Sequence, residues 1–324
     1  MPEPGELRDD AVGLVDLGAI GDQVDGPDLE AQERARARLG PADHLDDDPD
    51  DPDDLDGDSD GAGPRPGLGR LLDLALWWAA VRGDDRAGPP ASVVQLGAER
   101  AVPVGRAAGM PRLLDLAPPP TAADALRWGV DLADRLADEA VELVLVGCPD
   151  PLPATVLTAE LMGLDAVEAC GWPLARGMSD AAWMDEVDVV REGLRRTRGL
   201  RGTTPQLLVA LGSPATAACT AFLLRSAARR TPVILDGRGA AAAAMTARRS
   251  ARPAGQWWQA ATGSSHPLGA RMLDSLELEP LTDLGIEGSD GLAGVTALAV
   301  LDVAASVLSS DGGPTAPGHG GGRR

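Results

Sequence analysis

Apolar residues in this chain form two kinds of segment. Short runs of four to six apolar residues end at Gly, Pro or Asp, as buried strands do. Longer stretches repeat apolar residues every three or four positions, and Leu71, Leu74, Ala75 and Trp78 form one such stripe. The pattern predicts strands at 92–96, 141–146, 206–211, 232–235, 256–260 and 281–284. It predicts helices at 26–39, 67–82, 122–137, 154–162, 180–196, 215–229, 240–249, 269–276 and 291–308.

Short strands that alternate with longer helices are typical of a parallel sheet. We therefore predict an α/β fold, with a doubly wound, mainly parallel sheet, helices on both faces and a reduced helical N-terminal small domain. Ligands of such sheets bind beyond the carboxyl ends of the strands. The loops expected to form the site are 97–103, 147–155, 212–215, 236–239, 262–269 and 285–291.

The chain divides by composition into four predicted parts: a helical segment 1–40, an acidic insertion 41–64, the α/β domain 65–310 and a flexible tail 311–324. Eleven Asp residues lie between Asp43 and Asp60, a density of charge that prevents a segment from burying a core. Asp56 and Asp58 resemble the start of a calcium loop. Its twelfth position is Gly67 instead of Glu, so we expect a solvated loop.

Composition excludes several classes of function. The net charge of −21 makes nucleic acid and anionic membrane poor partners. The chain has no Lys, which excludes a Schiff base and a P-loop lysine. Its three cysteines have no CxxC spacing and its three histidines are scattered, so neither a metal site nor a cofactor is expected. No apolar run of membrane-spanning length and no signal peptide are recognised, which favours the cytoplasm.

Several stretches of the sequence match the motifs of one known family in their residues, their order and their spacing. They are Arg65–Ala80 (RPGLGRLLDLALWWAA), Arg229–Gly237 (RRTPVILDG), Trp257–Pro267 (WWQAATGSSHP) and Leu276–Gly294 (LELEPLTDLGIEGSDGLAG). The chain resembles the nicotinate-nucleotide:dimethylbenzimidazole phosphoribosyltransferase family, as a divergent member of the actinobacterial type. The resemblance is specific over the last hundred residues of the α/β domain and weaker before them.

This resemblance implies a pentosyl transfer in cobalamin biosynthesis. The family moves phosphoribose from nicotinate mononucleotide to a benzimidazole base and forms α-ribazole phosphate. Such a step needs a carboxylate to accept the imidazole proton as the ring nitrogen attacks C1′ of the ribose. It also needs donors for the 5′-phosphate and an apolar slot for the flat base.

Asp290 is the candidate catalytic residue. It stands, followed by Gly291, where the family has the Glu of a Gly-Glu-Gly-Thr/Ser-Gly motif. Asp is shorter by one methylene, and a misplacement of about 1 Å can reduce a rate roughly a hundredfold. Glu287 is a neighbouring carboxylate that could compensate. An Asp-Gly pair is also typical of an ordinary N-cap before the following helix.

The predicted phosphate loop departs from the family. Between Gly147 and Thr155, which match the family motif, three prolines remove amide donors and Asp150 adds a negative charge. Arg176 offers a guanidinium in place of backbone donors. Glu186 stands where the family has Lys. His266 has no clean counterpart and is expected at the surface.

The substrate-binding residues implied by the resemblance are Gly147, Thr155, Arg176, Asp236, Gly237, Ser264 and Gly291. Two hypotheses stay open. In the first, the protein is an active transferase in which Asp290 is the base and Arg176, Arg238 and Thr155 hold the phosphate. In the second, it is a catalytically degenerate relative that binds a ligand or a partner. The expected partners are nicotinate mononucleotide and a benzimidazole base, with a homodimer or a complete paralogue as protein partner.

Overall fold

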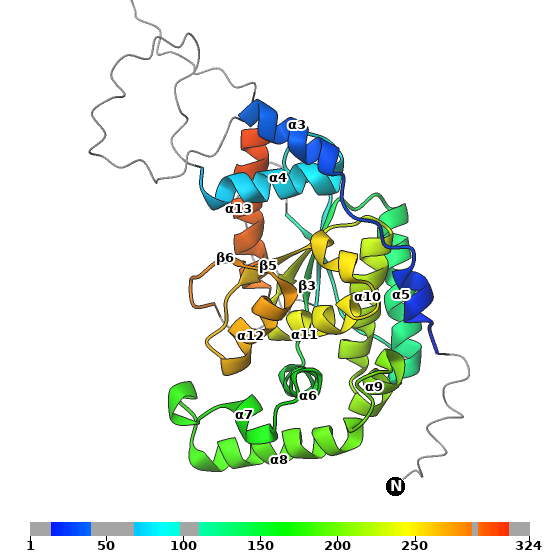
Figure 1. Ribbon diagram of the computed structural model, residues 1–324, viewed down its shortest axis with the longest axis vertical. Coiled ribbons are helices and arrows are strands. Elements are labelled where there is room, and N and C mark those ends of the chain that lie inside the picture. Colours follow the sequence, from blue (N-terminus) through cyan, green and yellow to red (C-terminus); the bar gives the residue numbers. More distant parts are fainter. Residues whose placement is uncertain (1–13, 40–67, 98–109, 287–290, 311–324) are drawn as a thin grey trace, which may run out of the picture. The chain divides into compact units, whose positions relative to one another are not determined.

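The computed structural model describes residues 14–39, 68–97, 110–286 and 291–310 (Figure 1). The chain forms two compact units. The first comprises Met1–Pro27 and Pro90–Ala299, and the second comprises Asp28–Pro89 and Val300–Arg324. The predicted acidic insertion, the C-terminal tail and Asp290 lie outside the described residues, so the structure says nothing about them.

The first unit is built on a six-stranded sheet. Its strands are β1 (Val93–Leu96), β2 (Arg112–Leu114), β3 (Leu143–Gly147), β4 (Val233–Asp236), β5 (Trp258–Thr262) and β6 (Pro280–Thr282). They run in the order β2-β1-β3-β4-β5-β6, and every pair is parallel. The order reverses between β1 and β3, because the chain leaves β1 for β2 and returns on the other side. This reversal is the mark of a doubly wound sheet, and the predicted fold class is confirmed.

Helices cover both faces of this sheet. The first unit contains α2 (Leu17–Gly21), α5 (Ala122–Asp138), α6 (Pro151–Met162), α7 (Ala166–Cys170), α8 (Asp180–Thr197), α9 (Thr204–Leu211), α10 (Pro214–Ala228), α11 (Gly237–Arg248) and α12 (Pro267–Leu276). Helices α5, α10, α11 and α12 follow one another along one face, as right-handed crossovers require. The start of α13 (Leu292–Ser309) lies on the other face, where Gly294 contacts Leu145.

The core of the first unit is formed by fully buried strands and an Ala-rich helix layer. β1, β3 and β4 are buried along their whole length, as expected for strands covered on both faces. Trp257 and Trp258 are also buried, so they belong to this core. The indole Nε1 of Trp257 donates to the carbonyl of Asp25 at 2.8 Å.

One predicted strand is wrong. Residues 206–211 belong to helix α9, which has Pro205 in its first turn and ends at Leu211, before the C-cap residue Gly212. Gly212 has a φ of 73° and donates to the Leu208 carbonyl, so it forms a left-handed C-cap. An apolar run of this length fits a buried helix as well as a strand, and the Pro and Gly at its ends decide for the helix. The loop 212–215 therefore joins two helices and does not leave a strand.

Several short elements were missed by the sequence prediction, strand β2 and helix α7 among them. Strand β2 has only three residues, and its exposed side chains give no apolar run. Helix α7 (Ala166–Cys170) has five residues and is capped by Asp165 at its start and by Gly171 at its end. Both are too short to produce a periodic signal.

Helix α13 corrects a further expectation. By length and composition it could cross a membrane, with a mean hydropathy of 1.9 over 18 residues. The sequence prediction that no apolar run reaches this length was wrong. Asp302 is the only charged residue of this helix, whose other residues are mostly Ala, Leu and Val. Half of the window is buried inside the structure, and a core helix passes the same test, so this is weak evidence for a span.

The described part of the second unit contains α3 (Leu29–Leu39), α4 (Arg70–Arg82) and the end of α13. Trp78 is completely buried, and its Nε1 donates to the Gly88 carbonyl at 3.0 Å. The Asp28 amide donates to the Ala80 carbonyl at 3.0 Å and ties α3 to α4.

Candidate functional site

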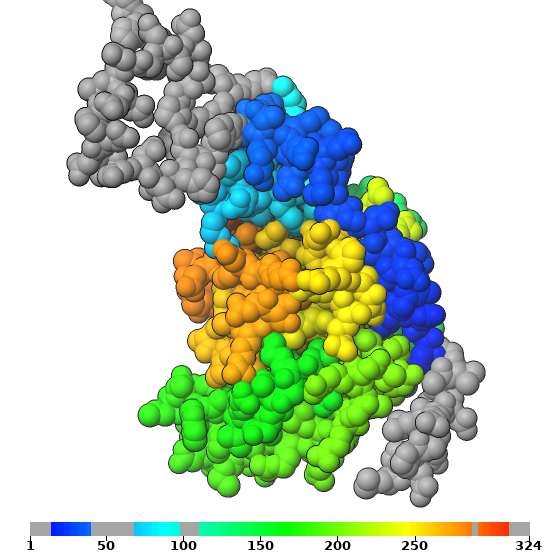
Figure 2. All heavy atoms as spheres, viewed as in Figure 1, coloured from blue at the N-terminus to red at the C-terminus, as the bar shows by residue number. Residues whose placement is uncertain are grey.

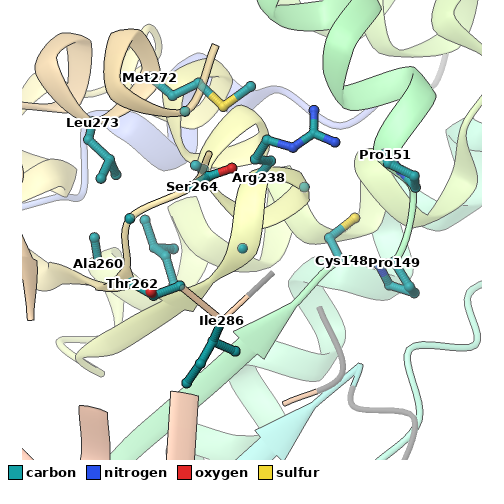
Figure 3. Close-up of a pocket in the computed structure, with 16 residues that line it drawn as sticks. Cys148, Pro149, Pro151, Arg238, Ala260, Thr262, Ser264, Met272, Leu273 and Ile286 are labelled. Atoms are coloured by element: carbon teal, nitrogen blue, oxygen red, sulfur yellow. The ribbon is translucent and has the colours of Figure 1, made fainter. Parts of the chain in front are cut away.

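A cavity of about 360 Å³ opens beyond the carboxyl ends of β3, β4 and β5 (Figure 3). It lies beside the point where the strand order reverses, which is where ligands of doubly wound sheets bind. Its lining residues are Cys148, Pro149, Pro151, Leu235, Gly237, Arg238, Gly239, Ala241, Ala260, Thr262, Gly263, Ser264, Gly269, Met272, Leu273 and Ile286. On the face shown in Figure 2, α12 (orange) borders α6 to α8 (green), and α12 packs against α6 and α7.

The first turn of α11 brings its backbone close to the loop after β3. Gly237 has a φ of 80°, a conformation that favours glycine. A Cβ at Gly239 would lie 2.0 Å from the carbonyl oxygen of Cys148. Glycine at 239 therefore permits the close approach that forms this wall of the cavity.

Arg238 supplies the positive charge of the cavity. Its side chain reaches from α11 toward Pro151 and α6 (Figure 3). Its Nη1 lies 3.4 Å from Oγ1 of Thr155. The Thr155 hydroxyl in turn donates to the Pro151 carbonyl at 3.0 Å. Thr155 therefore reaches the cavity through Arg238 and does not line it.

Asp150 does not line the cavity, although the sequence places it in the predicted phosphate loop. Its Oδ2 accepts a hydrogen bond from the Ser213 hydroxyl, which also receives the Thr216 amide at 3.1 Å. The carboxylate is thus held against the start of α10. The negative charge of Asp150 therefore repels a phosphate in the cavity less strongly than was expected from its place in the predicted phosphate loop.

The expectation that His266 lies at the surface is wrong. Only 6% of its surface is exposed, because it is the N-cap residue of α12 and is covered where that helix packs on α7. Its Nδ1 accepts from the Leu268 amide at 3.2 Å. Burial, together with the positive charges of Arg238 and Arg176, lowers the pKa of His266 to about 3. The ring is therefore neutral at physiological pH.

Arg176 is held outside the cavity lining. Its Nη1 donates to Glu186 at 2.9 Å and to the Cys170 carbonyl at 3.0 Å. The two side chains of the pair are 16% and 12% exposed. Glu186, the carboxylate at the charge-reversed position, is thus neutralised by Arg176. Burial and the Glu186 charge raise the pKa of the Cys170 thiol to about 11.

The start of α13 is fixed by two buried side chains. Oδ2 of Asp236 accepts from the Gly294 amide at 2.7 Å, and Nε2 of Gln95 donates to the Gly291 carbonyl at 2.8 Å. Both side chains are almost fully buried. Asp236 therefore supports the residues that follow position 290 and does not face the cavity. Gln95 was missed by the sequence prediction, although a Gln in the buried strand VVQL is a signal of such a role.

Only some of the predicted substrate-binding residues lie at the cavity. Gly237 and Ser264 line the cavity, and Gly147 ends β3 next to the lining residue Cys148. Arg176, Asp236 and Gly291 make the structural contacts given above. Asp290 lies outside the described residues. The apolar part of the lining was missed because its residues come from separate elements; they are Leu235, Ala260, Met272, Leu273 and Ile286.

Comparison with known proteins identifies the chain. A family model described as "Phosphoribosyltransferase" matches residues 118–311, more than half of the sequence. The chain belongs to the nicotinate-nucleotide:dimethylbenzimidazole phosphoribosyltransferase family. The resemblance noted in the sequence is thereby confirmed.

Curated members of this phosphoribosyltransferase family align with part of the chain. The nicotinate-nucleotide--dimethylbenzimidazole phosphoribosyltransferase of Streptomyces avermitilis is 41% identical over 191 residues, which are 57% of this chain and 50% of the relative. The Streptomyces coelicolor enzyme of the same name is 38% identical over 212 residues, 64% of this chain and 58% of the relative. The chain thus spans 50% to 58% of the length of these two relatives.

Solved structures extend the similarity over most of the fold. CobT from Thermus thermophilus matches with a TM-score of 0.64 and covers 86% of this chain and 96% of its own. Its sequence identity is 22%, so the match concerns the fold. It agrees with the doubly wound sheet described above.

Proposed function

We propose that the protein transfers phosphoribose from nicotinate mononucleotide to a benzimidazole base and forms α-ribazole phosphate for cobalamin biosynthesis. The observation that supports this most directly is the cavity at the carboxyl ends of β3 to β5, in a chain of this family. It combines apolar lining residues with the positive charge of Arg238, which suits a flat base and an anionic sugar phosphate.

The reaction is a displacement at C1′ of the ribose. A benzimidazole ring nitrogen forms the new bond to C1′ while the bond between C1′ and the pyridine nitrogen of nicotinate breaks. The electron pair of that bond neutralises the pyridinium, so the departing ring needs no strong acid. The second benzimidazole nitrogen loses its proton to a carboxylate.

Asp290 is the residue we propose for this proton transfer. It is one peptide bond from Gly291, whose carbonyl is held by Gln95 near the carboxyl end of β1. The structure therefore fixes Gly291, the residue that follows Asp290 in the sequence, near the carboxyl end of β1. Gly147, Gly237 and Ser264 are proposed to contact the substrate from the ends of β3, β4 and β5, and Thr155 to contact it through Arg238.

The test is an incubation of the purified chain with nicotinate mononucleotide and 5,6-dimethylbenzimidazole. Mass spectrometry should detect α-ribazole phosphate and nicotinate in equal amounts. Binding of nicotinate mononucleotide without any product would instead support a degenerate relative that only binds ligands. No cofactor or metal is added in this proposal.

The proposal also covers partners and location. The partners are the two small substrates and a second copy of this chain, and the location is the cytoplasm. The homodimer is supported by exposed apolar side chains close together in sequence and structure. Trp172 is 72% exposed, Leu174 92% and Met184 60%, and Trp172 stacks on Trp183 with ring centroids 6.4 Å apart.

A further inference from the structure

A second cavity, of about 570 Å³, is formed by α6, α7 and α8, which pack against one another (Figure 1). It shares no lining residue with the cavity at the ends of the strands. Its lining comes from the end of α6, the turn into α7, the C-terminal half of α8 and the segment that follows α8. Four of the lining residues are arginines: Arg191, Arg195, Arg198 and Arg201.

These arginines concentrate positive charge in an acidic chain. The segment 191–201 contains five Arg and one Glu, whereas the whole chain has a net charge of −21. Arg191 and Arg195 are four residues apart on α8, a spacing at which like charges destabilise a helix. Arginines in the last turn interact favourably with the helix dipole, but neither Arg191 nor Arg201 lies in that turn. A bound anion would relieve the repulsion among these side chains.

Carboxylates of α8 neutralise its arginines only weakly. Arg191 pairs with Asp188 and Arg195 with Glu192, and all four side chains are at least half exposed. Exposed pairs of this kind contribute little. The side chain of Arg198, the C-cap residue of α8, has no ion pair with any residue that the structure describes. The guanidinium groups on this side of the cavity can therefore bind an anion.

Arg201 completes the lining from the segment after α8. Its Nε lies 3.8 Å from Oε1 of Glu160, whose side chain is mostly buried. A Cβ at Gly163, the C-cap residue of α6, would lie 3.3 Å from Nη2 of Arg201, so glycine leaves room for the guanidinium. Nη2 of Arg249 donates to the Arg201 carbonyl at 2.8 Å and holds this part of the backbone. Asp165, the other carboxylate of the lining, already accepts an amide of α7 as its N-cap.

Guanidinium groups bind phosphate oxygens strongly, because they keep their charge and donate two parallel hydrogen bonds. The rise of an α-helix separates Arg191 from Arg198 by about 10 Å, so one phosphate cannot contact all the arginines. Two linked phosphates can contact neighbouring ones. We propose that this cavity binds a small molecule that carries a diphosphate group. The site goes beyond the proposed function and does not depend on it.

The experiment measures binding of inorganic pyrophosphate and of inorganic phosphate by calorimetry, without divalent cations. The wild type should bind pyrophosphate at least about 10-fold more tightly than phosphate, because more than one arginine contacts it. Arg198→Ala and Arg201→Ala should each weaken pyrophosphate binding about 5- to 10-fold, between the effect of an exposed ion pair and that of a charge-assisted hydrogen bond. Arg198→Glu should weaken it further, since it adds a negative charge to the site.

Arg196→Ala is the matched control, because Arg196 lies in the last turn of α8 and does not line the cavity. Arg238→Ala tests whether pyrophosphate binds in the first cavity instead. Both variants should keep the pyrophosphate affinity of the wild type. The proposal is overturned by wild-type affinity in Arg198→Ala and Arg201→Ala, by an equal loss in Arg196→Ala, or by loss of this binding in Arg238→Ala. Absence of pyrophosphate binding, or tighter binding of a peptide of Asp residues, would overturn it too.

The outcomes separate this inference from the proposed function. A chain that binds pyrophosphate through Arg198 and Arg201 but yields no α-ribazole phosphate keeps this site and loses the transferase. A chain that yields product, but whose pyrophosphate affinity is the same with and without Arg198, keeps the transferase and loses this site.

Discussion

At the scale of single residues, His266 links the stability of the fold to pH. Its pKa is about 3 in the folded chain, against the ordinary value of 6.5. Between these values the unfolded chain binds a proton on this ring and the folded chain does not. The contribution of His266 to the free energy of unfolding is therefore complete above pH 6.5 and is lost as the pH falls toward 3.

We expect the free energy of unfolding to fall by up to about 1.4 kcal/mol per pH unit on account of this residue. Urea unfolding at several pH values between 7.5 and 4.5 would measure it. The asparagine variant His266→Asn is the reference, since carboxylates contribute equally to both proteins. Parallel pH dependences in the two proteins would contradict the assignment.

The pair of Arg176 and Glu186 is a second single-residue case. Its side chains are mostly buried, so removal of one partner leaves an uncompensated charge. Glu186→Ala should lower the free energy of unfolding by about 3 kcal/mol. Asp188→Ala, which breaks the exposed pair with Arg191 on the same helix, should cost less than about 1 kcal/mol. Equal losses in the two variants, measured by chemical denaturation, would refute this difference.

At the scale of elements, the cavity depends on how closely α11 approaches β3. Gly239→Ala places a methyl group 2.0 Å from the Cys148 carbonyl oxygen, and backbone must move to relieve it. We expect a loss of about 1–3 kcal/mol in stability, together with weaker binding of nicotinate mononucleotide. Gly202→Ala is the control, because no atom lies within 4 Å of its added Cβ. Unchanged binding by Gly239→Ala would show that this wall does not shape the site.

Most of the longer helices and strands were predicted correctly from the apolar pattern of the sequence. Strand β3 was predicted within two residues at each end, because its short apolar run ends at Gly147, and helix α8 was predicted within one residue, because its pattern is long and begins at Asp180. Helix α9 was mistaken for a strand, because its run of six residues is too short to distinguish the two periods. Strand β2 was missed because its pairing with β1 is a tertiary contact that its own residues do not encode.

The site was less predictable than the sheet. Gly237 and Ser264 line the cavity because they lie within two residues of the ends of β4 and β5. His266 was misplaced, because its burial depends on packing between elements far apart in the sequence. The contact between Asp236 and Gly294 joins two positions that no local pattern relates.

At the scale of the whole molecule, self-association is the expected consequence of the exposed apolar side chains around Trp172 and Leu174. Sedimentation velocity should show a dimer at micromolar concentration. The double variant Trp172→Glu and Leu174→Glu should sediment as a monomer, because like charges would then meet across a symmetric interface. A monomeric wild type would remove the homodimer from the proposal.

In the proposed function, a chain of this family with an altered phosphate loop still uses Asp290 as the general base of the transfer. The most direct measurement is the rate of α-ribazole phosphate formation by the wild type and by Asp290→Asn, at saturating nicotinate mononucleotide and dimethylbenzimidazole. We predict a measurable rate for the wild type and a rate at least about a hundredfold lower for the variant, since general base catalysis contributes roughly 10²–10⁴. Equal rates in the two proteins, or no product from either, would contradict the account.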